Sequence, residues 1–326
     1  MINNPFLSCV VPAYNEAENL KKFIPALAQQ LEQQNLRYEI IVIDDGSQDQ
    51  TVAVLEQMLN DYPLRILKLS RNFGKEAALS AGLDYVTGDA ALLIDADFQH
   101  PLDAIPSMIQ LWKNGYDMVY GIRDRSTESW LKKVFTRCYY HILNLSSSVD
   151  IPENAGDFRL LDLKVVDAVK KLSEKNRYMK GLYAWVGFKS IGIHFTEQQR
   201  QHGQSSFNFK ALFQLAMSGL TGFSDLPLRL CIYLGALLAI FAMSYGVWII
   251  IETLIEGIRV PGWATLAAGM TLLGGIQLLC IGILGEYIGR IYAEVKNRPK
   301  YIVSAEYSHI QPKPVLQEKQ NNVASF

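Results

Sequence analysis

The stretch Ala90-Ala91-Leu92-Leu93-Ile94-Asp95-Ala96-Asp97 is an apolar run that ends in two acids. A run of this kind predicts a short strand, residues 90–94, that is buried on both faces of a sheet. The strand does not require acids at its end, whereas carboxylate oxygens are ligands that Mg²⁺ and Mn²⁺ prefer. Gln99 continues the spacing of two residues from Asp95 and Asp97 and offers a third oxygen. A lone D-x-D motif is often a solvated loop end or a helix cap, so its place after a buried strand is what favours a metal site.

Strand-like and helix-like segments alternate through the first 121 residues. The other expected strands are residues 6–11, 39–43, 64–69 and 118–120. The expected helices are residues 20–31, 51–59, 76–86 and 102–112. This alternation predicts an α/β fold with a doubly wound, mostly parallel sheet. Ligands of such sheets bind beyond the carboxyl ends of the strands, and three polar clusters fall there: residues 12–16, 44–49 and 95–99.

Asp44 and Asp45 follow directly on the second expected strand. One interpretation is a turn and a helix start, with Asp49 or Ser47 as the cap. Another is a buried carboxylate that accepts hydrogen bonds from a base N–H or from ribose hydroxyls. The phosphate-loop, dinucleotide-binding and nucleophile-elbow motifs are all missing from the sequence, which argues against those three enzyme classes.

Two long stretches near the C-terminus carry no charge. Residues 231–251 and residues 260–285 each lack Asp, Glu, Lys and Arg. The shorter stretch spans roughly 31 Å as a helix, which is enough to cross a bilayer core. A pair of buried helices in a soluble core is the alternative. The short link between them predicts an antiparallel hairpin.

Basic residues flank the two stretches and predict their orientation. They are Lys210, Arg229, Arg290, Lys296, Arg298 and Lys300, against Arg259 alone in the link. Since Lys and Arg concentrate on the cytoplasmic side, the link should lie outside and both termini in the cytoplasm. We expect no secretory signal, because no basic region precedes the first apolar stretch.

The overall composition excludes several classes of protein. Lys and Arg number 31 and Asp and Glu 32, giving a formal net charge of −1, which argues against a nucleic-acid binder. Hydrophobic residues make up 49%, which excludes a disordered chain. The four cysteines form no C-x-x-C pair and are expected to be free thiols in a reducing compartment.

We therefore expect three parts: an α/β domain over residues 1–228, two membrane helices within 229–290 (about 230–252 and 262–286), and a cytoplasmic tail over 291–326. Residues 130–145 predict a helix with basic and aromatic faces. Residues 207–220 predict an amphipathic helix, either core-facing or at the membrane surface. Residues 302–326 are polar and are expected to be flexible.

Several motifs in this order resemble those of the family-2, GT-A-fold glycosyltransferases. They are Val11-Pro12-Ala13-Tyr14-Asn15-Glu16, Val42-Ile43-Asp44-Asp45-Gly46-Ser47 and Asp95-Ala96-Asp97-Phe98-Gln99-His100-Pro101. Residues 70–76, residues 156–159 and the two apolar stretches narrow the resemblance. It then points to the polyisoprenyl-phosphate glycosyltransferases, which include the bactoprenol glucosyltransferases and the dolichol-phosphate mannose synthases. The resemblance covers about residues 5–300.

The resemblance implies a role for individual residues. The nucleotide pocket would involve Pro12, Tyr14, Glu16, Asp44, Asp45, Lys75 and Asp95. A Mg²⁺ or Mn²⁺ ion on the donor diphosphate would be held by Asp95, Asp97 and Gln99. The acceptor phosphate would be bound by Arg123, Lys132, Thr136 and Arg137. Asp157 would lie beside the reacting centre, and Asp97 and Arg200 would also serve catalysis. A loop with Arg200, Gly203 and Ser205 would close over the diphosphate; the family usually continues it with Lys, whereas this chain has Ser206.

The implied reaction is inverting transfer of a hexose, with UDP-glucose as the favoured donor, to undecaprenyl phosphate at the bacterial inner membrane. The product would be a lipid-linked monosaccharide that modifies a cell-surface glycan such as lipopolysaccharide or O-antigen. Mannose, GlcNAc or an aminoarabinose derivative are alternative sugars. A non-catalytic, membrane-anchored subunit that binds a nucleotide sugar is another reading. A processive synthase is disfavoured because the Q-x-x-R-W motif is missing. The resemblance also makes a tetramer conceivable, and Gly285 and Gly289 form a G-x-x-x-G pair.

Overall fold

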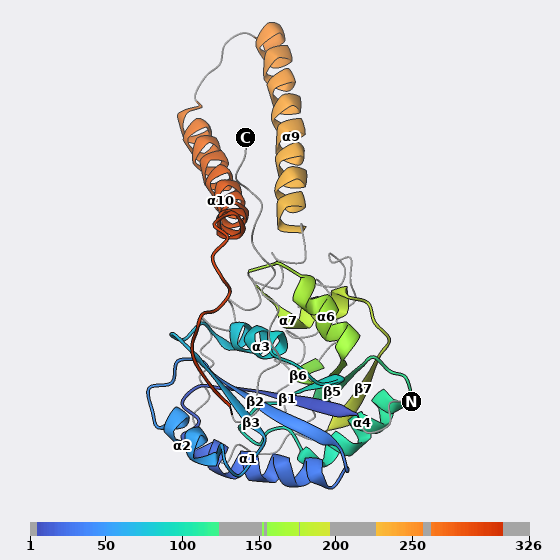
Figure 1. The fold of residues 1–326 in the computed structure, drawn as a ribbon. Coiled ribbons are helices and arrows are strands. Elements are labelled where there is room, and N and C mark those ends of the chain that lie inside the picture. Colours follow the sequence, from blue (N-terminus) through green and yellow to red (C-terminus); the bar gives the residue numbers. More distant parts are fainter. Residues whose placement is uncertain are drawn as a thin grey trace, which may run out of the picture.

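The computed structural model describes residues 5–123, 152, 155–175, 177–195, 226–256 and 262–308. The expected helices at 130–145 and 207–220 lie outside these ranges. Within them the chain forms an α/β domain, from which two long helices project (Figure 1).

The described residues form one eight-stranded sheet in the order β7-β5-β6-β4-β1-β2-β3-β8. Its strands are β1 (Phe6–Ala13), β2 (Arg37–Asp44), β3 (Leu64–Leu69), β4 (Ala90–Leu93), β5 (Met118–Arg123), β6 (Ala155–Asp162), β7 (Ser190–Phe195) and β8 (Val303–Ser308). The central strand β1 is parallel to β2 and β4, β2 is parallel to β3, and β5 is parallel to β7. Strand β6 runs antiparallel to β4 and β5, and β8 runs antiparallel to β3. The expected doubly wound α/β sheet is confirmed, with antiparallel members added to it.

Helices cover both faces of the sheet (Figure 1). One face carries α1 (Ala17–Glu32), α2 (Thr51–Met58), the 3₁₀ turn η1 (Leu102–Ala104) and α4 (Ile105–Lys113). The other carries α3 (Lys75–Asp84), α6 (Leu163–Lys171) and α7 (Met179–Trp185). Side chains alternate between the two cores: Ile40 and Val42 of β2 face the first, and Ile41 and Ile43 face the second. Burial on both faces explains why these strands are continuous apolar runs in the sequence.

Helices α9 (Leu226–Glu256) and α10 (Trp263–Val295) run in opposite directions as a hairpin (Figure 1). Their segments Leu230–Ile249 and Leu272–Val295 are long and apolar enough to cross a membrane, with mean hydropathies of 2.0 and 1.6. Neither segment is buried within the part of the chain that the structure describes. The two expected helices are therefore present, and the second apolar segment ends at Val295 rather than near residue 286.

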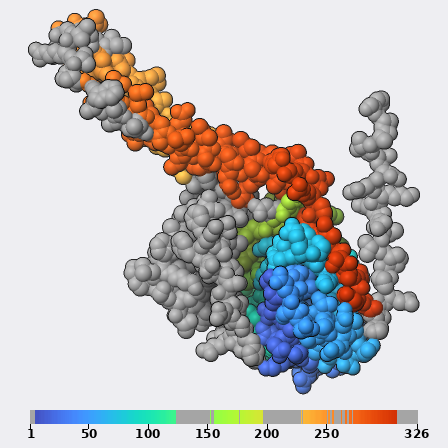
Figure 2. Space-filling model, turned by 90° about the vertical axis from the view of Figure 1, so that its left-hand side faces the viewer, coloured from blue at the N-terminus to red at the C-terminus, as the bar shows by residue number. Residues whose placement is uncertain are grey.

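The C-terminal segment corrects one expectation. Residues 302–326 were expected to be flexible, yet Val303–Ser308 forms β8 at the edge of the sheet. Glu306 pairs with Arg65 of β3 at 2.7 Å, and Tyr301 donates a hydrogen bond to Asp84 at 2.8 Å. Figure 2 shows the red end of the chain lying against the blue and cyan domain. The polar composition concealed this strand because an edge strand buries only alternate side chains.

Candidate active site

The register of the sheet brings two distant acids together. Leu93 of β4 pairs with Arg159 of the antiparallel β6. Asp95 lies two residues after Leu93, and Asp157 lies two residues before Arg159. Since the strands run in opposite directions, both acids reach the same edge of the sheet.

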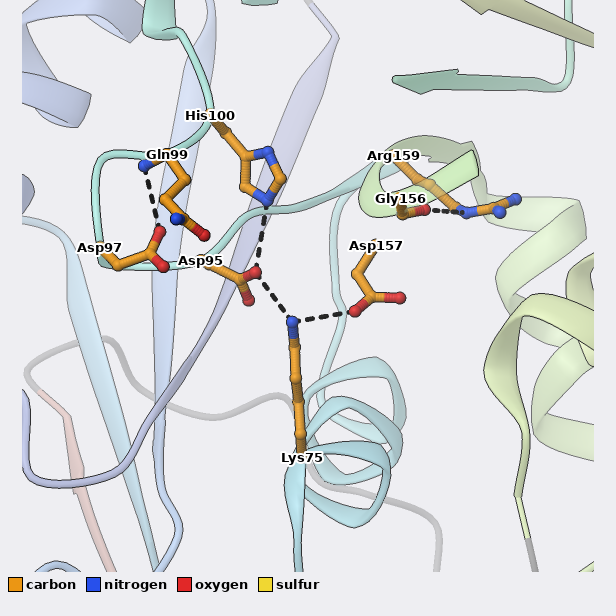
Figure 3. A network of polar contacts seen from close by, with 8 residues as sticks. All are labelled: Lys75, Asp95, Asp97, Gln99, His100, Gly156, Asp157 and Arg159. Carbon is orange, nitrogen blue, oxygen red and sulfur yellow. Dashed lines mark hydrogen bonds and ion pairs between the residues drawn. The ribbon is translucent and has the colours of Figure 1, made fainter. Parts of the chain in front are cut away.

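Lys75, the first residue of α3, lies between these acids (Figure 3). Its Nζ is 2.8 Å from Asp95 Oδ2 and 2.8 Å from Asp157 Oδ2. We call Lys75, Asp95 and Asp157 the ion triad. The resemblance assigned Lys75 and Asp95 to the nucleotide pocket and Asp157 to the reacting centre, and the structure shows that Lys75 contacts both acids.

The ion triad keeps all three groups charged. Burial acts to raise the pKa of Asp157, but Lys75 and Lys180 together lower that pKa to about 2. Burial acts to raise the pKa of Asp95 as well, but Lys75 and His100 together hold it well below its usual range. Burial opposes the charge of Lys75 in turn, yet Asp157 and Asp95 raise the lysine pKa above its ordinary value. An ionised carboxylate of such low pKa is a poor general base near pH 7.

His100 supports Asp95 from the other side (Figure 3). Its Nε2 lies 3.3 Å from Asp95 Oδ2, and its ring stacks on Phe158 with centroids 5.0 Å apart. The side chain is buried, so the ring has a fixed position. The sequence analysis predicts no role for His100, although this residue lies within the Asp95–Pro101 motif.

The expected metal ligands lie on one turn (Figure 3). Asp97 Oδ1 accepts a hydrogen bond from the backbone N–H of Gln99 at 3.1 Å, and Phe98 between them has φ 60°. Asp95, at the start of this turn, uses only Oδ2 for its contacts with Lys75 and His100.

The donor set fits a divalent ion only in part. Among the described residues no three His, Cys, Asp or Glu side chains group as a metal site. Two carboxylates and an amide are nevertheless a suitable share of a Mg²⁺ site, because Mg²⁺ is commonly held by one or two carboxylates plus substrate phosphates. The residues thus fit a metal that arrives with a diphosphate.

Asp45 has a role that the sequence did not reveal. Its Oδ1 accepts from the N–H of Phe73 at 2.7 Å and its Oδ2 accepts from the N–H of Gly74 at 2.9 Å. Gly74 has φ 97°, a conformation that favours glycine, and Lys75 follows it directly. Asp45 therefore positions the turn that presents Lys75.

Asp44 is fully buried at the end of β2. Its Oδ1 accepts from the N–H of Ser47 at 3.2 Å, whereas its buried Oδ2 has no hydrogen-bond partner in the described part of the chain. Burial raises the pKa of both Asp44 and Asp45. An unpartnered buried oxygen of this kind suits a donor group such as a base N–H.

The loops after β1 and β2 are joined by hydrogen bonds. Asn15 N–H donates to Ser47 Oγ at 2.8 Å, and Gln48 N–H donates to Asn15 Oδ1 at 2.8 Å. Glu16 N–H donates to Thr51 Oγ1 at 3.1 Å. Tyr14 is 44% exposed at this edge, and Pro12 is half-buried at the end of β1. The expected nucleotide-pocket residues are thus brought together, and their roles remain predictions. Asp49 Oδ1 also accepts from Thr51 N–H at 3.0 Å, although the N-cap residue of α2 is Gln50 rather than Asp49 or Ser47.

The remaining predicted residues lie outside the described ranges. They are Lys132, Thr136, Arg137, Arg200, Gly203 and Ser205. Arg123 ends β5, but its side chain is not described.

Sequence reasoning also missed Glu76 and Arg159. Glu76 Oε2 accepts from the N–H of Met179 at 3.1 Å, and burial together with Asp157 raises its pKa to about 7. Arg159 is buried, with its guanidinium 4.6 Å from the ring centre of Tyr183. The sequence marks these two residues only by their closeness to predicted site residues: Glu76 directly follows Lys75, and Arg159 lies two residues after Asp157.

Two family models match this chain. The model for glycosyl transferase family 2 matches residues 8–170, and the model for the GtrB C-terminal hairpin matches residues 226–291. The first covers the strands and helices that form the ion triad, and the second covers α9 and most of α10.

Characterised and uncharacterised relatives agree with these matches. A bactoprenol glucosyl transferase of Shigella phage SfII is 44% identical over 303 residues, covering 92% of this chain and 98% of that protein. An uncharacterised glycosyltransferase of Synechocystis sp. is 43% identical over 303 residues, covering 91% and 94%. A prophage bactoprenol glucosyl transferase homolog of Escherichia coli K12 is 43% identical over 299 residues, covering 91% and 98%.

A weaker likeness extends to a solved structure, a Pyrobaculum calidifontis mannosyltransferase in complex with GDP-Man and Mn²⁺. Its TM-score is 0.45 and its identity 14%, over 91% of this chain and 89% of that one. The ligands of that protein are its own. On the full-length identities and the match over residues 8–170, this chain belongs to glycosyl transferase family 2 and is a glycosyltransferase with a C-terminal hairpin.

Proposed function

We propose that this protein is a membrane-bound, inverting glycosyltransferase that moves glucose from UDP-glucose to undecaprenyl phosphate. The product is a lipid-linked monosaccharide for the modification of a cell-surface glycan. The relatives named bactoprenol glucosyl transferase support the acceptor and the sugar. Mannose, GlcNAc and an aminoarabinose derivative are the alternative sugars, and the family match favours the enzyme over an anchored, non-catalytic subunit.

The reaction is a single displacement at the anomeric carbon. An oxygen of the acceptor phosphate forms a bond to that carbon, and the bond from the carbon to the donor diphosphate breaks. The electron pair leaves with the nucleoside diphosphate. The phosphate nucleophile is already anionic, so the site needs positive charge and orientation more than a strong base.

Lys75 and the divalent ion would supply the positive charge, since the two carboxylates of the ion triad outnumber its one ammonium, and Asp157 would supply the orientation. Asp157, with a pKa of about 2, stays ionised and orients Lys75 instead of removing a proton. Lys75 lies where its ammonium can meet the negative charge that develops on the leaving diphosphate. Asp97 and Gln99, with Asp95, would hold the divalent ion, which when bound neutralises diphosphate charge as a Lewis acid. Asp44, Asp45, Tyr14, Glu16 and Pro12 would form the nucleotide pocket.

The hairpin supports a membrane-resident acceptor. Helices α9 and α10 carry apolar segments on the same chain as the strand-end acids. An extremely apolar polyprenyl chain stays in the bilayer, so an anchored enzyme meets its phosphate at the membrane surface. We place the protein in the bacterial inner membrane as a multi-pass protein, with the α/β domain and both termini in the cytoplasm. Arg123, Lys132, Thr136 and Arg137 would bind the acceptor phosphate, while Arg200, Gly203 and Ser205 would close over the donor. A homotetramer is part of the proposal.

The observation that carries the proposal is the contact of Lys75 with both Asp95 and Asp157 beside the Asp97 turn. The test offers detergent-purified protein a panel of radiolabelled UDP- and GDP-sugars with undecaprenyl phosphate and Mg²⁺ or Mn²⁺. Label from UDP-glucose is expected in the organic phase, and EDTA should abolish it.

Asp97→Asn and Asp103→Asn form a matched pair for this test. Asp103 is an exposed acid six residues further along, in η1. Loss of transfer in Asp97→Asn with normal transfer in Asp103→Asn supports the assignment. Transfer from another donor in the panel would show that the sugar is not glucose and would name the correct one. No transfer from any donor by a protein that still binds nucleotide would reject the enzyme reading.

A further inference from the structure

A basic hollow lies where α10 meets the α/β domain. Its volume is about 340 Å³. The described residues that line it are Lys175, Tyr292, Ala293, Lys296, Arg298, Pro299 and Lys300. We call this hollow the junction pocket.

Basic side chains predominate in the lining of the junction pocket. Four of its described lining residues are Lys or Arg, and none of them is acidic. The Nζ of Lys175 is buried and has no hydrogen-bond partner within the described ranges. A buried, unpaired ammonium is costly unless a ligand completes it.

Neighbouring groups do not remove this charge. The carboxylate of Glu294 accepts from the backbone N–H of Lys175 at 2.8 Å, not from its ammonium. Lys300 Nζ donates to the carbonyl of Leu172 at 2.8 Å. Burial and the charge of Arg177 lower the pKa of Lys300, although Asp84, Glu174 and Glu294 oppose this effect. The net surroundings therefore favour an added anion.

With α10 inserted in the bilayer as proposed, the junction pocket lies at the depth of lipid headgroups. The apolar segment Leu272–Val295 ends one residue before Lys296. Tyr292 lines the pocket from the last turn of α10, with Lys296 Nζ 4.1 Å from its ring centre. Tyrosine and basic residues at the end of a membrane helix are typical of the membrane–water interface. In Figure 2 the surface of α10 continues from the hairpin down onto the α/β domain.

We propose that the junction pocket binds the phosphate headgroup of an anionic bilayer lipid, as basic pockets at the cytoplasmic ends of membrane helices do. We propose it as a site separate from the acceptor site, and the undecaprenyl phosphate arm of the test below distinguishes the two. This lipid-binding proposal depends on the membrane insertion that is part of the proposed function, but it does not depend on glycosyl transfer. A bound headgroup would join α10 to Lys175, in the segment before α7. The first residue of α7, Met179, donates its backbone N–H to Glu76, which follows Lys75 in the chain.

The test counts lipids bound to the full-length protein by native mass spectrometry. The protein is titrated in neutral detergent with phosphatidylglycerol and, separately, with phosphatidylcholine. Two variants remove charge from the pocket: Lys175→Met, and Lys296→Gln with Arg298→Gln. A matched control, Lys21→Gln with Lys22→Gln, removes two exposed charges from α1. Thermal unfolding of each variant reports folding.

We expect one phosphatidylglycerol to bind in preference to phosphatidylcholine. Each removed charge should weaken its binding about fivefold, and the double variant more than Lys175→Met. The control should bind as the wild type does. Lys175→Met should unfold normally, because its Nζ has no hydrogen bond to lose in the described part of the molecule.

Three results would overturn the proposal. One is equal phosphatidylglycerol binding by every variant or no preference over phosphatidylcholine. Another is displacement of phosphatidylglycerol by undecaprenyl phosphate, which would assign the pocket to the acceptor. The last is displacement by inorganic phosphate, which would make it a site for free phosphate. A failure of glycosyl transfer leaves this readout unchanged, so the two proposals can fail separately.

Discussion

Two pairs of acids at the same edge of the sheet differ in what faces them. Asp95 and Asp157 share the ammonium of Lys75. Asp44 and Asp45 face backbone N–H groups instead. Burial acts to raise the pKa in all four cases. Lys75, together with His100 at Asp95 and Lys180 at Asp157, lowers the pKa of the first pair, while that of the second pair stays raised.

The comparison shows that a formal charge in contact outweighs burial, whereas neutral donors only soften its effect. The pKa shifts of the two pairs therefore change the pH dependence of stability in opposite directions. The lowered pKa of Asp157, about 2, contributes stability that is present above the ordinary carboxyl pKa and is lost as the pH falls toward 2. The raised pKa of Asp44 and Asp45 contributes stability at low pH that is lost as the pH rises.

The largest expected effect comes from removing the shared cation. Lys75→Met leaves two ionised acids side by side and takes positive charge from the proposed diphosphate site. We expect the rate of transfer at saturating substrates to fall by about 100-fold or more. Acid unfolding should begin at a higher pH than in the wild type, because Asp95 and Asp157 lose the partner that keeps them ionised.

Lys21→Met is the control for this change, since Lys21 is exposed on α1 and pairs with Glu18 at 2.6 Å. It should leave both measurements unchanged. If Lys75→Met kept more than half of the wild-type rate, the ion triad would have no part in transfer.

The next effect separates the two members of the second pair. Asp45→Asn replaces one of two accepting oxygens with a donor that faces a backbone N–H. The expected loss of stability is about 2 kcal/mol. Asp44→Asn should cost less than about 0.5 kcal/mol, because the Oδ2 of Asp44 has no hydrogen-bond partner in the described structure. Chemical unfolding of both variants in detergent measures the difference. Equal losses would show that the Asp45 contacts with Phe73 and Gly74 do not hold the turn before Lys75.

The smallest effect tests whether contact or mere proximity to Lys75 decides a pKa. Glu76 adjoins Lys75 in the chain, yet burial and Asp157 raise its pKa to about 7. Its stabilising contribution is therefore full below the ordinary glutamate pKa and is lost as the pH rises through 7. Glu76→Gln should gain about 1 kcal/mol at pH 8 relative to pH 5, a value kept small because the side chain is only half-buried.

Thermal unfolding of wild type and Glu76→Gln at the two pH values gives this measurement. If the stability of both proteins changed equally between pH 5 and pH 8, the pKa of Glu76 would not be raised. Proximity to Lys75, without contact, would then be enough to keep a buried acid ionised.

Strands that are continuous apolar runs were predictable, whereas the inner strand β6 and the edge strands β7 and β8 were not. The expected strand 64–69 has the bounds of β3, Leu64–Leu69, and the expected strand 90–94 matches β4 to within one residue. Continuous apolar runs identify such strands without knowledge of their neighbours. Strands β7 and β8 were missed because their side chains are mostly half-buried or exposed, so their pattern is weak in the sequence. Strand β6 was missed although it is mostly buried, because Asp157, Arg159 and Asp162 interrupt its apolar run.

The candidate site divides in the same way. The acids at the ends of β2 and β4 could be named from their place after apolar runs. The partner of Asp95 could not, because Lys75 is 20 residues away and its contact depends on where α3 starts. His100 and Glu76 were missed because no spacing rule marks a residue that acts through another.

The sequence by itself determined the alternation of strands and helices, the acids at the strand ends and the two long apolar helices. Each of these is a local pattern, set by the periodicity of a strand or helix and by the length that crosses a bilayer. Only the tertiary structure decided that Lys75 joins Asp95 to Asp157, that β8 returns from the hairpin to the edge of the sheet, and that Lys175 meets the basic end of α10. These contacts depend on strand register and on the packing of segments far apart in the chain, which no local pattern contains.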